Sequence, residues 1–246
     1  MRVVRLSGSA VVLMVASVAF STSVSLGANI DVRDKVQMDK TEARSKTLVL
    51  IGASYAGGWP SDQLVGGYRV MNKGVNGQQS HEMLARFKTD VVVLNPNAVL
   101  IWGFINDIFR SDQTKIRETL DRTRKSMQAM VDLAKQSGIV PILATEVTIR
   151  GKDEWKEVIG DLVGSLLRKA SYQDYVNRHV RETNQWIREL AVREQVQLLD
   201  FETVLADQQG VRRKELSRPD GSHISQKGYE ALTRYAEERL RVALGD

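Results

Sequence analysis

Residues 47–54 read TLVLIGAS, a short apolar run that ends in a glycine, an alanine and a serine. An apolar run of this length, bounded by a glycine, predicts a strand that is buried on both faces, as in a parallel sheet. Ser54 would then lie in the turn after the strand. Ligands of open parallel sheets bind beyond the carboxyl ends of the strands. The stretch therefore directs attention to Ser54 and to the loops that follow the other strands.

Apolar runs and amphipathic segments continue to alternate along the chain. Further strands are expected at 68–71, 98–102, 139–144 and 196–200, and helices at 80–94, 115–136 and 225–244. Strands that alternate with helices predict one parallel sheet with helices on both faces and right-handed crossovers. Residues 47–246 are expected to form one such domain, preceded by a polar, loose lead-in at 29–46.

About fifty residues between the fourth and fifth predicted strands do not fit this minimal alternation. Their apolar spacing predicts two amphipathic helices, near 155–167 and 173–193, within a helical insertion at about 150–193. Packing of these helices on the core is the simpler interpretation. A lid over the site, or a face turned toward a membrane, is the alternative.

The first 28 residues have the layout of a secretory signal peptide. Arg2 and Arg5 precede an apolar run at 10–20, and small residues then accumulate toward Ala28. Removal of residues 1–28 takes away two of the 35 basic residues and none of the 30 acidic ones, so the formal charge falls from +5 to +3. The protein is therefore expected to be exported, to the periplasm or the medium. An uncleaved N-terminal membrane anchor is the alternative.

The composition excludes several kinds of chemistry. The chain has no cysteine, which rules out disulfides, thiolate metal sites, iron–sulfur clusters and a cysteine nucleophile. It has three histidines, so no histidine-rich metal site is expected, and the serine chemistry inferred below requires neither a metal nor another cofactor. His81 is expected to begin a helix and His179 to lie on a charged helical surface, which leaves His223 beside an acid in a loop. The basic residues are dispersed and form no nucleic-acid motif, so no nucleic-acid partner is expected.

Four loops of the predicted sheet carry groups suited to acyl chemistry. Ser54 would be exposed at a strand-to-helix turn. Asp220 precedes His223 by three residues, where a carboxylate can orient an imidazole and leave its other nitrogen free to deprotonate a serine. Gly74 and Asn106 follow the second and third strands and offer N–H donors to an oxyanion. Each also has a structural interpretation, Gly74 as a turn glycine and Asn106 as a helix cap.

These four loops together resemble the SGNH hydrolases, also called the GDSL esterase/lipase family, over roughly residues 47–244. The matching segments are Ile51-Gly52-Ala53-Ser54, Asn72-Lys73-Gly74, Ile105-Asn106-Asp107 and Asp220-Gly221-Ser222-His223. The resemblance implies a three-layer α/β/α sandwich with a five-stranded, flavodoxin-like parallel sheet. It implies a triad of Ser54, Asp220 and His223, and an oxyanion hole formed by Ser54, Gly74 and Asn106.

The sequence departs from the family pattern at two positions. Ala53 stands where the family has an aspartate, which is not a triad member, so activity is expected to be retained. Phe104 occupies the place of the glycine in the third block, and Gly103 precedes it. Trp59 and Phe104 are candidates for lining a substrate pocket.

The expected function is an exported serine esterase that forms an acyl-enzyme on Ser54. Its substrate would be a small-molecule, polysaccharide or lipid ester. One alternative is acyl transfer or deacetylation on envelope polysaccharide, and another is a non-catalytic, carbohydrate-binding protein of the same fold. Membrane association is expected only through an uncleaved N-terminal segment, and the sequence does not predict an oligomeric state.

Overall fold

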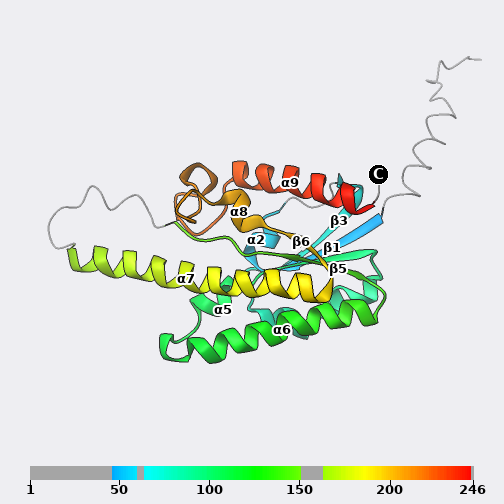
Figure 1. Ribbon diagram of the computed structural model, residues 1–246, viewed down its shortest axis with the longest axis horizontal. Coiled ribbons are helices and arrows are strands. Elements are labelled where there is room, and N and C mark those ends of the chain that lie inside the picture. The colour runs from blue at the N-terminus through cyan, green and yellow to red at the C-terminus, as the bar shows by residue number, and fades with distance from the viewer. Residues whose placement is uncertain (1–45, 60–63, 151–162, 245–246) are drawn as a thin grey trace, which may run out of the picture. The chain divides into compact units, whose positions relative to one another are not determined.

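A mostly parallel sheet forms the centre of the protein in the computed structural model, which describes residues 46–59, 64–150 and 163–244 (Figure 1). Its strands are β1 (Lys46–Gly52), β2 (Leu64–Val65), β3 (Tyr68–Gly74), β4 (Ala98–Trp102), β5 (Val140–Ala144) and β6 (Gln197–Leu199). The strand order is β2-β3-β1-β4-β5-β6, and all pairs are parallel except β2 with β3. The predicted α/β fold is confirmed.

The sheet has six strands in its described part and not the predicted five. The additional strand is β2, whose two residues pair with the start of β3. Gly66 and Gly67, the two residues between them, have φ angles of 56° and 84°. Left-handed conformations at both central residues are what a two-residue hairpin requires, so the pair of glycines produces the sixth strand.

Helices cover both faces of this sheet. The long helices are α6 (Ile116–Gln136), α7 (Val163–Glu194) and α9 (Gln226–Leu244). The short ones are α2 (Ser54–Gly57), α3 (Ser80–Ala85), α4 (Phe87–Asp90), α5 (Ile105–Phe109) and α8 (Phe201–Leu205). Figure 1 shows α6 and α7 along one face and α8 and α9 along the other. In the described parts of the chain, no helix is long and apolar enough to cross a membrane.

The helix predicted at 80–94 is wrong, because the segment breaks into α3, α4 and a 3-10 turn, η1 (Val92–Leu94). The first break lies at Arg86, which has φ −100° and ψ 4°. Its guanidinium donates to Gly52 O at the end of β1 and to Asp90 in the next turn. A contact with the sheet therefore fixes the chain where local propensity favours a continuous helix.

The predicted insertion contains one long helix in its described part. α7 runs without interruption from Val163 to Glu194, across the gap predicted at 168–172, which holds neither glycine nor proline. Its apolar face is fully buried at Val176, Val180, Ile187 and Leu190. His179 is also buried rather than on a charged surface, because its ring packs edge-on against Tyr175. Residues 151–162, which hold most of the first predicted helix, lie outside the described residues.

Candidate active site

Close backbone contacts bring the carboxyl ends of the central strands together. In the register of the sheet, Gly52 of β1 pairs with Gly74 of β3 and with Trp102 of β4. A Cβ atom on Gly52 would lie 2.1 Å from Trp102 O, and one on Gly74 would lie 2.1 Å from Gly57 N. No other residue type fits at either position, so the two glycines allow β4 and α2 to approach the end of the sheet.

Ser54 is the first residue of α2, in the turn directly after β1. It is partly exposed, and its hydroxyl makes no hydrogen bond to another described residue. The next residue, Tyr55, is buried and donates its hydroxyl to Ser222 O at 2.5 Å. The Tyr55 ring also lies edge-on to His223, with 6.4 Å between ring centroids. Tyr55 therefore ties the Ser54 turn to the loop that carries the histidine.

Asp220 and His223 form a local pair in that loop. The Nδ1 atom of His223 lies 2.8 Å from Asp220 Oδ2, and Asp220 Oδ1 accepts the amides of Ser222 and His223, each at 2.8 Å. Burial opposes ionisation of Asp220, but these hydrogen bonds outweigh it and hold the pKa of the carboxyl well below its usual range. Because an ionised carboxylate only accepts, Nδ1 carries the proton, and Nε2 is the nitrogen free to act as a base.

Asn106 lies in α5, and its neighbour fixes that helix. The Asn106 Nδ2 atom donates to Gln78 O at 3.0 Å, which uses one of its two N–H groups. Asp107 is fully buried and accepts the Ser80 amide at 2.7 Å, the Ser80 hydroxyl at 2.8 Å and the Thr123 hydroxyl at 3.0 Å. Burial raises the pKa of Asp107, although these hydrogen bonds act in the opposite direction. α5 is thereby anchored to α3 and α6.

Two glycines near the end of β3 differ in the hydrogen bonds of their amides. The Gly74 amide is already used, because it donates to Asn72 Oδ1 at 2.8 Å. Gly77 lies three residues further along the same loop, with a φ angle of 78°. Its amide has no acceptor among the described residues, and the next carbonyl, Gln78 O, binds Asn106. The sequence analysis did not single out Gly77, although it is a second glycine in the same turn.

The two side chains expected to line a substrate pocket belong to the core. Phe104 is fully buried, and Trp59 is 5% exposed. The Trp59 indole N–H donates to Thr233 Oγ1 at 3.0 Å, and its ring packs edge-on against Trp102 and Phe201. Neither side chain therefore presents a face to a substrate in this conformation.

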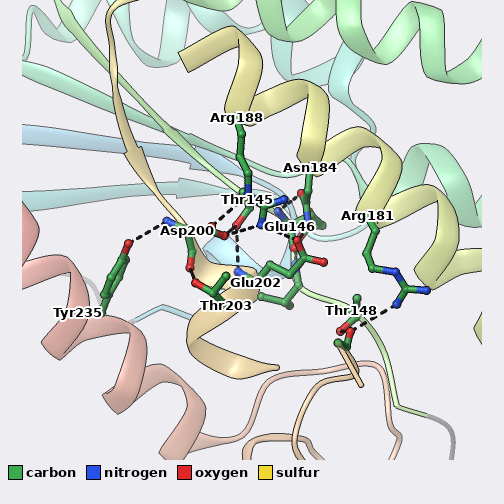
Figure 2. A network of polar contacts seen from close by, with 12 residues as sticks. Thr145, Glu146, Thr148, Arg181, Asn184, Arg188, Asp200, Glu202, Thr203 and Tyr235 are labelled. Carbon is green, nitrogen blue, oxygen red and sulfur yellow. Dashed lines mark hydrogen bonds and ion pairs between the residues drawn. The ribbon is translucent and has the colours of Figure 1, made fainter. Parts of the chain in front are cut away.

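A polar network lies at the carboxyl ends of β5 and β6 (Figure 2). The Thr145 hydroxyl donates to Asp200 Oδ1 at 2.9 Å and accepts the Glu202 amide at 2.9 Å. Arg188 of α7 donates through Nη2 to Asp200 Oδ1 at 2.9 Å and to Glu202 Oε2 at 2.7 Å. These bonds attach α7 to the carboxyl edge of the sheet. Among the described residues, no cluster of acidic and histidine side chains could hold a metal ion.

A serine in a turn after a strand, an aspartate–histidine pair and nearby N–H donors are the groups of a serine hydrolase. Residues 50–231 match the model of the GDSL-like lipase/acylhydrolase family. The match covers most of the chain, so the chain belongs to this family, in agreement with the resemblance seen in the sequence.

Solved structures share the fold. A G-D-S-L family protein of Desulfitobacterium hafniense DCB-2 is 26% identical, with a TM-score of 0.59, and the match covers 78% of this chain and 98% of that one. Axe2, an acetylxylan esterase from Geobacillus stearothermophilus, is 19% identical with a TM-score of 0.58, over 79% of this chain and 94% of that one. At 19% identity, the similarity to Axe2 shows a shared fold only.

A curated relative matches part of the chain. It is the uncharacterized lipoprotein YqeF of Bacillus subtilis (strain 168), 27% identical over 132 residues. These residues are 54% of this chain and 48% of the relative, so the chain spans about half the length of the relative it matches.

Proposed function

We propose that the protein is a serine esterase that hydrolyses a carboxylic ester through an acyl-enzyme on Ser54. The observation that carries the proposal is the link between Tyr55 and Ser222, which ties the serine turn to the loop of Asp220 and His223. Family membership supports the reaction class.

In the proposed reaction, His223 Nε2 takes the proton of Ser54 as its Oγ attacks the ester carbonyl. The tetrahedral oxyanion accepts hydrogen bonds from the Ser54 amide, from the Asn106 side chain and from the Gly77 amide, which replaces that of Gly74. The Ser54 amide begins α2 and so has no intrahelical acceptor. The protonated histidine then donates its proton to the leaving alcohol, and water, deprotonated by the same nitrogen, releases the acid.

The test is covalent labelling of Ser54. A fluorophosphonate probe should label the wild-type protein, and Ser54→Ala should abolish both the labelling and the hydrolysis of p-nitrophenyl acetate. Ser137→Ala is the matched control. Ser137 caps the C-terminus of α6 just before β5, at the amino ends of the parallel strands and away from Ser54. A folded wild-type protein that is not labelled, or Ser54→Ala with wild-type activity, would contradict the proposal.

Hydrolysis is favoured over acyl transfer by the exposure of the reacting pair. The side chains of His223 and Asp220 are 47% and 41% exposed, so water reaches the place where the acyl-enzyme would form. Release of acetate to water should therefore exceed transfer to added sugar hydroxyls. Rates for a series of p-nitrophenyl esters, for acetylated xylan and for a lysophospholipid would identify the acyl and alcohol parts of the preferred substrate. Acetylated xylan is included because a structural neighbour is an acetylxylan esterase.

Export is part of the same proposal. It is supported by the signal-peptide layout of residues 1–28 and by a relative that is a lipoprotein. The sequence has no cysteine to carry a lipid, so the proposal is a released protein. N-terminal sequencing of the protein from the extracytoplasmic fraction should then begin near residue 29, whereas an intact Met1 would indicate a retained anchor.

A further inference from the structure

Two buried side chains of opposite charge bind the backbone of loops of the proposed site and touch none of its reacting groups. Glu146 follows β5 by two residues and is 1% exposed, and Arg212 is fully buried. Charged side chains are almost never fully buried unless they are paired or hydrogen-bonded. Their contacts therefore indicate what each one holds in place.

Glu146 holds the segment that carries Asn106. Its Oε2 atom accepts the Phe104 amide at 3.0 Å and the Ile105 amide at 3.4 Å, which are the two residues directly before Asn106. Its own backbone is clamped by Asn184 of α7, whose side chain accepts the Glu146 amide and donates to its carbonyl, each at 2.7 Å (Figure 2). The carboxylate is thus a fixed acceptor that sets where α5 begins.

Arg212 holds the segment that carries His223. Its Nη2 atom donates to Gly221 O at 3.0 Å and to Ser222 O at 2.6 Å, the two carbonyls between Asp220 and His223. Its guanidinium carbon also lies 5.6 Å from the centroid of the Tyr55 ring, and the Tyr55 hydroxyl donates to the same Ser222 carbonyl. Arg212 therefore braces both the histidine loop and the residue after Ser54.

Glu146 and Arg212 form no hydrogen bond or ion pair with each other, and each is held by backbone groups. The charge of Arg212 favours the ionised form of Glu146, which is also faced by Tyr55 of α2 and Tyr229 of α9. Burial raises the pKa of Tyr55 and raises that of Tyr229 to about 12, so both phenols remain neutral. The Nε and Nη1 atoms of Arg212 bond to no described residue. The Arg212 side chain is therefore held in this region through Nη2 alone, by the carbonyls of Gly221 and Ser222.

Resting on the esterase function proposed above, we propose that Glu146 and Arg212 are positioning residues for the reaction. Glu146 places the Asn106 donor, and Arg212 places His223 and the Ser54 turn, so two buried charged side chains align groups from three loops. Because both side chains are buried and bind only the protein backbone, their loss should change turnover and leave KM nearly unchanged.

The test compares Glu146→Leu, Arg212→Met and the double variant. Each variant leaves buried backbone groups without their hydrogen-bond partners, so all three should be less stable than the wild type. Turnover should fall about 100-fold in all three, with KM within about threefold, since an apolar pair cannot hold the Phe104 amide or the Ser222 carbonyl. A folded double variant with wild-type kcat overturns the proposal.

Conservative variants keep the proposal testable should the apolar ones fail to fold. Glu146→Gln retains an acceptor oxygen and should lose about tenfold in kcat. Its kcat should also fall less steeply in acid than that of the wild type. In the wild type, protonation of Glu146 weakens its hydrogen bonds to the amides at the start of α5, and the glutamine cannot be protonated in this way. Arg212→Lys should behave similarly in kcat but keep the wild-type pH profile. Wild-type kcat in both conservative variants, with an unchanged pH profile in Glu146→Gln, overturns the proposal.

Glu202→Gln is the matched control. Glu202 is also a buried carboxyl of this region, but its side chain binds Arg188 of α7 and no loop of the site (Figure 2). Its kcat should remain within about twofold of the wild type. A wild-type protein that is neither labelled by fluorophosphonate nor active overturns both proposals, whereas an active wild type with fully active variants overturns the positioning role alone.

Discussion

The amides of Gly74 and Gly77 differ in availability, although both glycines lie in the loop that begins at the end of β3. The Asn72 side chain accepts the Gly74 amide and donates to Ala56 O and Trp59 O, so it closes the start of the loop onto α2. The Gly77 amide is left beside the carbonyl that binds Asn106. The Asn72 side chain thus occupies the Gly74 amide and leaves the Gly77 amide available, which is why the proposed mechanism uses Gly77.

Gly77→Ala tests this assignment. An alanine at a φ of 78° is strained, and its Cβ would lie 2.9 Å from Arg110 Nη2, so the loop should shift. We expect a loss of about 1 kcal/mol in stability and at least tenfold in kcat, measured by chemical unfolding and ester hydrolysis. Gly138→Ala is the control, because its φ is 71° with open space around it. Equal kcat losses in the two variants would contradict a role for Gly77.

Among the elements, the short helix α5 is held in place by side-chain hydrogen bonds to α3 and α6. It has five residues, too few to be stable alone, yet it carries Asn106. Asp107 supplies the anchor, because it accepts two hydrogen bonds from Ser80 at the start of α3 and one from Thr123 in α6. The position of the donor therefore depends on a buried carboxyl one residue away.

Asp107→Ala should loosen this anchor. Its loss leaves the buried Ser80 and Thr123 donors without that acceptor, so we expect about 3 kcal/mol less stability in urea unfolding, together with a lower kcat. Asp112→Ala removes an exposed cap of the next 3-10 turn, η2 (Gln113–Lys115), and should change both far less. Equal effects of the two substitutions would show that α5 does not need the anchor.

The elements also show where sequence reasoning succeeds and where it stops. Apolar runs bounded by glycine or proline predict the buried strands, because burial on both faces leaves a pattern in the chain itself. The break of the predicted 80–94 helix at Arg86 leaves no such pattern, since it follows from a bond to Gly52 O, 34 residues away. Glu146 and Arg212 were missed for the same reason: their partners meet only in the folded protein.

Across the whole protein, the buried Glu146 couples stability to pH. Burial raises its pKa from 4.5 to about 7, against the amide bonds and Arg212. Between these values the folded protein binds a proton that the unfolded chain has released. The raised pKa therefore favours folding at low pH, and this contribution is lost as the pH rises through 7.

Glu146→Gln should remove that dependence. The shift corresponds to roughly 3 kcal/mol, so the stability of the variant relative to the wild type should increase by about this amount from pH 4 to pH 8. Urea unfolding at several pH values measures the difference, and Glu202→Gln is the control. A difference between Glu146→Gln and the wild type that does not change with pH would contradict the raised pKa.

The bond from Tyr55 to Ser222 O also fixes when the protein can become active during its synthesis. The two residues are 167 positions apart, and Tyr229 of α9 binds Tyr55 O from 174 positions away. At roughly 5–20 residues per second, a ribosome adds the histidine loop about 8–30 s after the serine turn. On the proposed function, a growing chain that carries Ser54 has no His223 beside it until translation is nearly over. An unfinished chain would then lack esterase activity in the cell that makes it.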